Sequence, residues 1–434
     1  MKKIYLILLL GLLLRLISLN QSLWLDEGIQ WWASSTFSIP HLATEYIKGD
    51  FNPPLYHVIL HIWIKIFGVS EISLRFPSVL FGLGTVYFVY KIGGHKAALL
   101  AATGPLLIYY SQEARMYSLS AFAVTATIYF MLKRQKLPYV IFLSLALYSH
   151  YLTWLLLPVL LYYFFLPTII SILSFIPFFP IFIQQLTQGL GAATNPAWAG
   201  LSSLSIKAIL LVPIKFLIGR IPVDFTPIYA FILFTPLCFV AYLFYKSLPC
   251  RQAGRDKKLL SLFFVPLVLG AIISLKVPVF TYFRFLYLVP IFYLIISQKL
   301  HSYAFYAFIA FNLLTTSYYL LATSNHREDW RSATSYIHML DNQAPVIIYA
   351  PVRPPFDYYN QDKSMILSDN QLDQLIGQPD AWFISYAQPI FDPQQKVKTT
   401  LENLGFQEIS ARHFRGVTVI RYKTFSAKLF SYVQ

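Results

Sequence analysis

The stretch Leu23-Trp-Leu-Asp-Glu-Gly-Ile-Gln-Trp-Trp32 places two adjacent acids shortly after an apolar run that extends from Ile4 to Leu19. Such a run predicts a transmembrane helix, and an acid at the mouth of a membrane helix is costly unless it faces water, a substrate or a partner. Residues 1–322 hold eight acids in all, so few carboxylates compete with Asp26 and Glu27 for a chemical role. The segment therefore indicates both a membrane fold and a site of chemistry.

The composition is that of a polytopic membrane protein, because 57% of the residues are hydrophobic and only 12% are charged. The net charge of +15 lies entirely in residues 1–322, which carry 23 Lys and Arg against eight acids. Residues 323–434 carry eleven basic and eleven acidic residues. Positive-inside topology and anionic membrane lipids explain the basic excess, and no basic stripe indicates a nucleic-acid partner.

Apolar runs predict an α-helical polytopic membrane protein with about eleven transmembrane helices. They lie near residues 4–20, 76–90, 97–110, 117–132, 138–149, 151–166, 168–184, 227–245, 259–275, 284–298 and 303–322. Lys and Arg fall in alternate short loops, which predicts that these loops face the cytoplasm of a plasma (inner) membrane. Two long loops, about 21–75 and 185–226, and the C-terminal tail are then extracytoplasmic.

The outer loops contain two predicted interfacial helices. The first extends from Leu55 to Phe67 and follows Asn52-Pro-Pro54. Its polar side chains recur every four residues, at His57, His61 and Lys65. That spacing draws one polar stripe along a helix in the membrane interface. A second interfacial helix is predicted from Leu204 to Leu217, with Lys207 and Lys215 as interfacial lysines.

The composition changes at about residue 323, where helical stretches begin to alternate with strand-like runs. The helical stretches are Trp330–Leu340 and Pro393–Leu404, and the strand-like runs are Val346–Tyr349, Ala381–Ser385 and Val417–Arg421. This alternation predicts a small extracytoplasmic α/β domain over residues 323–434, after a transmembrane catalytic domain over residues 1–322.

The two adjacent acids are expected to have different roles, since neighbouring side chains on regular structure point in different directions. One interpretation makes Asp26 a general base directed at an acceptor hydroxyl, with Glu27 holding substrate or structure. The other makes both acids the solvated end of a helix.

Two arginines in outer segments could bind a phosphate, because arginine offers several donors in a fixed fork. Arg115 lies with Glu113 in the turn Ser111-Gln-Glu-Ala-Arg-Met-Tyr117 at the membrane surface, where a local Glu–Arg pair is the alternative. Arg284 opens a span from the outer side, and we expect it to bind an anionic donor rather than to reach lipid headgroups.

The histidines allow two interpretations each. His57 and His61 form an H-x-x-x-H spacing that could bind a divalent metal, although the polar face of an interfacial helix is the commoner use. No cofactor is therefore predicted apart from a possible divalent metal, for which His57 and His61 are the candidate ligands. His150 fits either a substrate contact or an interfacial anchor.

Taken together, these segments resemble the GT-C superfamily of membrane glycosyltransferases, and within it glycosyltransferase family 39. That family includes the dolichyl-phosphate-mannose protein mannosyltransferases and their bacterial aminoarabinose-transferring cousins. The matching pieces occur in order over residues 1–335: Trp24-Leu-Asp-Glu27, Asn52-Pro-Pro-Leu-Tyr-His57, His61-Ile-Trp63 with Phe67-Gly68, Leu74-Arg-Phe-Pro77, Tyr110-Ser-Gln-Glu-Ala-Arg-Met-Tyr117, Tyr148-Ser-His150, Arg284-Phe-Leu with Pro290, and Glu328-Asp-Trp-Arg331.

The resemblance implies a glycosyltransferase, hexosyl or pentosyl and similar to the mannosyltransferases, that uses a polyprenyl-phosphate-linked sugar. It implies an active site on the outer face with Asp26 as catalytic base and with Glu113 and Arg115 near the donor phosphate. Arg284 is a further candidate for that phosphate. The acceptor would be a glycan, a lipid or a protein. Two departures concern the acceptor: His57 stands where many relatives have a tyrosine, and the tail does not resemble the sugar-binding repeats of the eukaryotic enzymes.

Attack at the anomeric carbon from the face opposite the phosphate would invert its configuration, with one carboxylate as base. The alternative from another class is a transporter or flippase of lipid-linked sugars. A transporter would place polar residues at mid-membrane in broken helices, whereas the charges here cluster on outer loops and at span ends. A glycan ligase or polymerase would use a diphosphate-linked donor instead, and a non-catalytic membrane scaffold is the remaining alternative.

Overall fold

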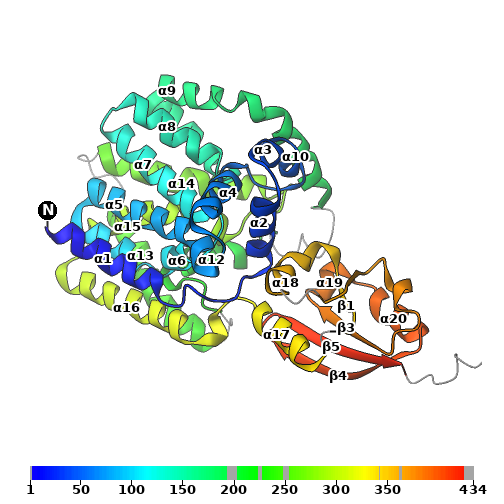
Figure 1. The fold of residues 1–434 in the computed structure, drawn as a ribbon. Coiled ribbons are helices and arrows are strands. Elements are labelled where there is room, and N and C mark those ends of the chain that lie inside the picture. Colours follow the sequence, from blue (N-terminus) through cyan, green and yellow to red (C-terminus); the bar gives the residue numbers. More distant parts are fainter. Residues whose placement is uncertain are drawn as a thin grey trace, which may run out of the picture. The chain divides into compact units, whose positions relative to one another are not determined.

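The computed structural model of the chain describes residues 2–192, 203–222, 227–247, 254–341, 343–360 and 364–424 (Figure 1). Parts of the predicted loop 185–226 therefore lie outside the described residues. Contacts divide the chain into two compact units. The first unit comprises Met1–Leu19 and Ala33–Asn325, and the second comprises Asn20–Trp32 and His326–Gln434.

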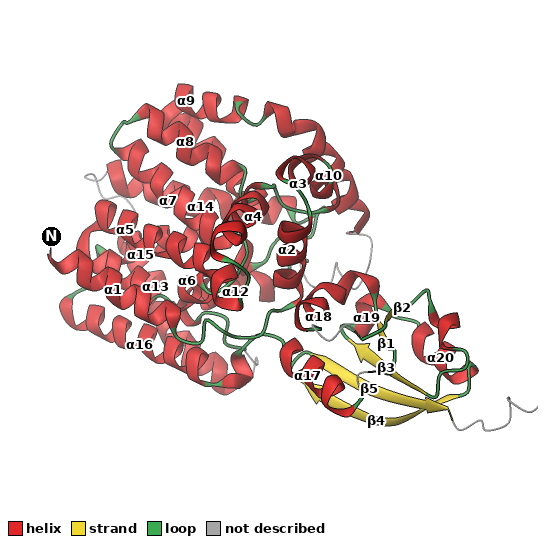
Figure 2. Ribbon diagram, viewed as in Figure 1, coloured by secondary structure: helices red, strands yellow, loops and turns green. Residues whose placement is uncertain are grey.

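The described part of the first unit consists of helices (Figure 2). They are α1 (Lys2–Leu16), the end of α2 (Leu25–Thr36), α3 (Ile39–Thr44), η1 (Tyr46–Gly49), α4 (Leu55–Phe67), α5 (Glu71–Thr103), α6 (Pro105–Ser111), α7 (Tyr117–Leu132), α8 (Lys136–Leu147), η2 (Tyr151–Leu156), α9 (Leu157–Leu173), η3 (Ile176–Phe178), α10 (Phe179–Ala192), α12 (Ile206–Ile218), α13 (Pro227–Ser247), α14 (Gly254–Ile273), η4 (Tyr282–Leu288), α15 (Val289–Ser297), α16 (Ser302–Leu321) and η5 (Thr323–Asn325).

Helix α5 packs against α1, α7, α15 and α16. Its 33 residues are interrupted at Gly94, where φ is +75°. Residues other than glycine rarely adopt this left-handed conformation, so Gly94 separates two helical segments within α5. The interruption falls between the two spans predicted at residues 76–90 and 97–110, inside the basic loop that the sequence places there.

Three helical stretches among the described residues are long and apolar enough to cross a membrane: Glu71–Thr103, Tyr151–Leu173 and Ser302–Leu321. Shorter apolar helices, such as Tyr117–Leu132 and Lys136–Leu147, accompany them. The predicted number of about eleven spans stays a prediction.

The two helices predicted for the interface are present, but their polar residues lie elsewhere than expected. Helix α4 begins at Leu55, after the two prolines, and both of its histidines are buried, His57 at 2% and His61 at 6% exposure. In α12 Lys207 is exposed as expected, whereas Lys215 is buried at 6% exposure. The prediction of interfacial side chains at His57, His61 and Lys215 is therefore wrong, because each of them packs inside the first unit.

The second unit contains a five-stranded mixed sheet in the order β2-β1-β3-β5-β4 (Figure 2). Strand β1 pairs in parallel with β2 and β3, while β5 pairs antiparallel with β3 and β4. The strands are β1 (Val346–Ile348), β2 (Ile366–Ser368), β3 (Asp380–Ser385), β4 (Phe406–Phe414) and β5 (Val417–Thr424). The helices are α17 (Trp330–Leu340), η6 (Ala350–Val352), α18 (Arg353–Tyr359), η7 (Leu372–Leu375), α19 (Gln388–Phe391) and α20 (Lys396–Asn403).

One apolar core joins the sheet to these helices. It is built around the fully buried rings of Trp330 and Trp382 and also includes Leu25, which lies in the first turn of α2. Burial of apolar surface on this scale is the main stabilising contribution to such a small domain. Because Leu25 belongs to this core, the start of α2 is an integral part of the second unit.

Candidate functional site

The two acids that the sequence singles out lie in the first turn of α2 and have different surroundings. Glu27 is fully buried, and its Oε2 lies 3.9 Å from Nε of the buried Arg327. Asp26 remains half-buried. This difference favours a structural role for Glu27, one of the two roles that the sequence leaves open, and leaves Asp26 as the acid with an accessible side chain.

Helix α2 also packs closely against α18 within the second unit. A Cβ added at Gly28 would lie 2.6 Å from the backbone nitrogen of Pro355, closer than any real side chain comes to such an atom. Glycine is therefore required at this position, directly after the two acids.

In the first unit, His57 and His61 both bind other protein groups. Nε2 of His57 donates to Oδ2 of Asp50 at 3.0 Å, and Nδ1 of His61 donates to the carbonyl oxygen of Ser34 at 2.8 Å. Across the described residues, no three His, Cys, Asp or Glu side chains are grouped as metal ligands. The two histidines thus form separate contacts rather than one ligand pair.

Asp50 is a polar residue of this loop that the sequence did not single out. Burial alone would raise the pKa of Asp50, but the hydrogen bond and charge of His57 and the charge of Arg115 lower that pKa from 3.8 to about 2. Asp50 is therefore a carboxylate at neutral pH, directed at His57 and close to Arg115. The sequence feature that could have indicated Asp50 is its position seven residues before His57, which lies on the following helix.

The side chains of the predicted phosphate-binding turn are buried inside the first unit. Glu113 is fully buried and Arg115 is 8% exposed, in the short irregular turn between α6 and α7. The Arg115 amide donates to the Glu113 carbonyl oxygen at 2.8 Å, which tightens the turn. Both side chains are thus enclosed by the first unit, and the location of the turn at the membrane surface stays a prediction.

His150 lies close to Arg115 and Arg284, and the positive charges of both arginines act on its ring. Burial, together with the positive charges of Arg284 and Arg115, lowers the pKa of His150 from 6.5 to about 3. Nδ1 of His150 accepts from the Leu152 amide at 3.3 Å, so the proton of the neutral ring is on Nε2. Three residues selected from distant parts of the sequence are thus close in space.

Arg284 lies on η4, a short helix that leads into α15. One of its guanidinium nitrogens donates to the Pro278 carbonyl oxygen at 3.0 Å. The guanidinium also lies 5.8 Å from the centre of the Phe283 ring. Arg284 is half-buried, so its guanidinium is held by the protein and is only partly open to solvent.

Two further cations join this cluster: Lys215, predicted from the sequence as an interfacial lysine, and Arg220, which the sequence did not single out. The Lys215 ammonium lies 5.6 Å from the centre of the Tyr282 ring, and the Arg220 guanidinium lies 5.2 Å from that of Tyr109. The charge of Glu113 acts on Arg220 and Tyr282. Lys215 also donates to the carbonyl oxygen of Ile221. The sequence feature that could have indicated this pair is the presence of two basic residues within six positions at the end of a predicted outer-loop helix.

Burial and the neighbouring Arg220 lower the pKa of Lys215 from 10.5 to about 8. An ammonium group in this state is partly desolvated and is readily stabilised by an anion. The lysine assigned to the membrane interface is thus a buried group suited to bind negative charge.

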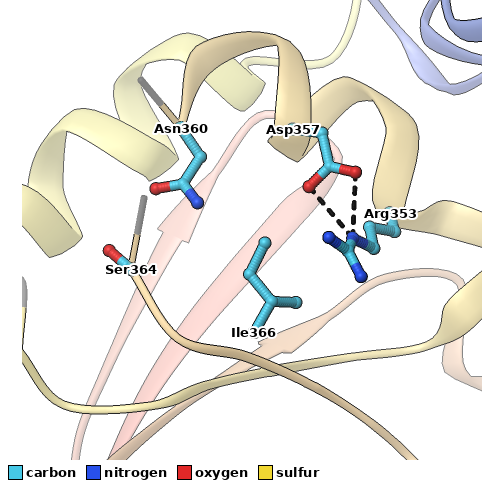
Figure 3. A pocket seen from close by; sticks show the side chains of 5 residues that line it. All are labelled: Arg353, Asp357, Asn360, Ser364 and Ile366. Carbon is cyan, nitrogen blue, oxygen red and sulfur yellow. Dashed lines mark hydrogen bonds and ion pairs between the residues drawn. The ribbon is translucent and has the colours of Figure 1, made fainter. Parts of the chain in front are cut away.

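A hollow of about 340 Å³ lies elsewhere in the second unit (Figure 3). Its lining residues are Arg353, Asp357, Asn360, Ser364 and Ile366, none of which the sequence predicted. Nε of Arg353 already donates to both oxygens of Asp357, at 3.0 and 2.9 Å. We assign no role to this hollow.

No family model and no curated protein matches the sequence. The structure, however, resembles that of ArnT from Cupriavidus metallidurans bound to undecaprenyl phosphate, with a TM-score of 0.58 and 10% sequence identity. The alignment covers 96% of this chain and 97% of that chain. The apo structure of the same protein aligns over the same shares with 11% identity and a TM-score of 0.45.

A likeness at this level of identity concerns the fold. It confirms the fold class predicted from the ordered motifs, whereas membership of family 39 stays a prediction. The chain therefore shares the fold of this ArnT structure, a mostly helical membrane-protein fold with a small C-terminal sheet domain.

Proposed function

We propose that the protein is a membrane glycosyltransferase that moves a sugar from a polyprenyl-phosphate donor to an acceptor hydroxyl. The observation that carries this proposal is the set of cations gathered inside the first unit. They are Arg115, Lys215, Arg220 and Arg284, of which Arg115 interacts with Asp50 and Arg220 with Glu113. Cations enclosed in a membrane protein are costly unless an anion or a partner compensates them.

A lipid monophosphate fits this cluster for two reasons. Its apolar tail stays in the bilayer, so the phosphate reaches the protein at the edge of the membrane. In sugar transfer the phosphate is also the leaving group, and cations aimed at it stabilise the negative charge that develops there. The likeness to a protein crystallised with undecaprenyl phosphate supports the same donor class.

Asp26 is proposed as the base that removes the proton from the acceptor hydroxyl. It is half-buried in the first turn of α2, whereas Glu27 is fully buried and lies 3.9 Å from Arg327. A single base with attack from the face opposite the phosphate inverts the anomeric carbon, without a covalent sugar–enzyme intermediate. Glu27, His57, His61, Glu113 and His150 are proposed to shape the substrate sites.

The test uses purified protein in lipid nanodiscs with a panel of polyprenyl-monophosphate sugars, each radiolabelled in the sugar, and a membrane extract as the source of acceptors. We expect at least one donor to lose its sugar to an acceptor. Asp26→Asn should lower this rate by about 10²- to 10⁴-fold, the usual contribution of a general base. The matched control is Glu45→Gln in the same loop, where an exposed acid pairs with Lys48 and the rate should not change.

Three results would contradict the proposed function or the proposed role of Asp26. Full transfer by Asp26→Asn would show that another group acts as base. Use of diphosphate-linked donors alone would favour a glycan ligase or polymerase. Movement of the intact labelled lipid across the bilayer without any transfer would support a flippase.

A further inference from the structure

The carboxylate of Glu328 binds the start of the helix that carries Asp26. Its Oε2 accepts from the Leu25 amide at 3.0 Å and from Nε1 of Trp330 at 2.8 Å. Its Oε1 accepts from the Tyr386 hydroxyl at 2.8 Å. All three partners are donors, which suits an ionised carboxylate because that group only accepts hydrogen bonds.

Leu25 is the first residue of α2, and the amides of the first helical turn have no partner inside the helix. A side chain just before the helix, commonly Ser, Thr, Asp or Asn, usually accepts from one of them. Trp24 occupies this position here, and its indole side chain has no hydrogen-bond acceptor. Glu328 supplies the acceptor from 303 residues away, while Glu27 Oε2 lies 3.5 Å from the Trp24 amide.

Other contacts within the second unit hold the same segment. The Leu23 amide donates to the Tyr359 hydroxyl at 2.9 Å, and the Arg331 amide donates to Oγ of Ser22 at 3.2 Å. The buried ion pair of Glu27 with Arg327 adds a charged contact in the same first turn of α2. Residues on both sides of Leu25 are thus fixed to the C-terminal domain.

We infer that Glu328 is a positioning residue for transfer: by capping α2 from the C-terminal domain it sets the place of Asp26. The inference rests on the proposed role of Asp26 as base. Displacement of a reacting group by about 1 Å costs on the order of 100-fold in rate, so the capping contact has a measurable effect on catalysis.

Electrostatics supports this placement. Burial raises the pKa of Glu328, its hydrogen bonds to Trp330, Tyr386 and Leu25 oppose that rise, and the negative charge of Asp26 adds to it. The charge of Asp26 thus acts on Glu328, as a neighbouring acid does.

The experiment compares kcat and the KM for the lipid donor in Glu328→Ala and Glu328→Gln. Loss of the acceptor in Glu328→Ala should lower kcat by about 10- to 100-fold while KM for the donor stays within about twofold. Glu328→Gln keeps one oxygen that can accept from Leu25, so it should recover most of the rate. Hydrogen exchange of the amides of residues 22–30 should be faster in Glu328→Ala and near wild type in Glu328→Gln.

The matched control is Asp392→Ala in the same domain. Asp392 is buried and accepts from the amides of Lys396 and Val397 at 2.8 and 3.1 Å, so its loss uncaps the start of α20 instead. A similar loss of thermal stability with unchanged kcat is expected. Should Asp392→Ala lower kcat as much as Glu328→Ala, the effect would be one of general domain stability and the inference would be overturned.

Failure of this inference is distinguishable from failure of the proposed function. A wild-type rate in Glu328→Ala, with Asp26→Asn inactive, would reject the positioning role alone. Unchanged hydrogen exchange in residues 22–30 would reject it even if Glu328→Ala were too unstable for kinetics. Absence of transfer by the wild-type protein, or full transfer by Asp26→Asn, would instead reject the proposed function.

Discussion

Burial beside two guanidinium groups keeps His150 neutral over the physiological pH range. Its pKa falls from 6.5 to about 3, so the folded state binds fewer protons than the unfolded state between these values. Stability contributed at this site is therefore present above pH 6.5 and is lost as the pH falls toward 3. A neutral ring adds no further positive charge beside Arg115 and Arg284.

Lys215 gives a prediction about alkaline pH. Because its pKa is lowered to about 8, the ammonium is charged below that pH and loses its charge above it. If it holds the donor phosphate, the Kd for polyprenyl phosphate should be steady below pH 7.5 and should rise by up to about tenfold per pH unit above pH 8. Equilibrium binding in nanodiscs between pH 6.5 and pH 9.5 measures this.

The control for this pH effect is Lys215→Arg, in which a guanidinium group replaces the ammonium group. In Lys215→Arg the charge persists throughout this range, so the Kd should remain flat to pH 9.5. Lys207→Ala, on the exposed part of the same helix, should behave like wild type. An alkaline rise that survives in Lys215→Arg would assign the titration to another group.

At the level of secondary structure, the helix that bears Asp26 depends on one glycine. A methyl group at Gly28 would overlap Pro355 of α18, with the nearest backbone atom at 2.6 Å. Overpacking of this kind costs about 1–3 kcal/mol. We expect Gly28→Ala to lower the melting temperature of the purified protein and to slow transfer, as measured by thermal unfolding and the radiolabel assay.

Gly49 provides the comparison for this substitution. A Cβ there meets no atom within 4 Å, so Gly49→Ala should leave both stability and transfer unchanged. Equal losses in the two variants would show that the Gly28 effect does not arise from its contact with α18.

Secondary structure could be predicted where apolar residues are concentrated. Strands β1, β3 and β5 coincide with apolar runs, and α17 was predicted with its observed bounds. Strand β4 was missed because seven of its nine residues are exposed and its sequence Phe-Gln-Glu-Ile-Ser-Ala-Arg-His-Phe has no apolar face. The strand is formed by antiparallel backbone pairing with β5, and the pattern of its side chains does not indicate this pairing.

The candidate site was predictable in part for the same reason. Arg115, His150 and Arg284 stand out in the sequence as charged or polar groups at the ends of apolar runs, and they lie together in the structure. Lys215 resembled an interfacial lysine because the sequence does not show which face of an amphipathic helix is covered. The contact of Glu328 with Leu25 joins residues 303 positions apart and has no local signature.

For the whole molecule, the distribution of charge predicts how the chain lies in the membrane. All of the +15 net charge lies in residues 1–322, and its short loops that are rich in lysine and arginine alternate along the chain. Loops rich in these residues remain in the cytoplasm. The C-terminal domain, which is neutral overall, should then face outward.

Cysteine labelling tests this topology. In a variant with Cys238 and Cys250 replaced by serine, Glu402→Cys, at an exposed position of α20, should react with a membrane-impermeant maleimide in intact cells. Lys133→Cys, also exposed, should react only after the membrane is permeabilised. The reverse pattern would place the C-terminal domain in the cytoplasm.

The second unit is built from two chain segments, Asn20–Trp32 and the residues from His326 onward, which are roughly 290 positions apart. A ribosome that adds about 5–20 residues per second needs about 15–60 s to pass from one to the other. During that interval the first turn of α2 has emerged, but Glu328 and Tyr386 do not yet exist. On the proposed role of Asp26, a nascent chain stays without activity until these late residues are made, and translation itself sets the moment at which catalysis begins.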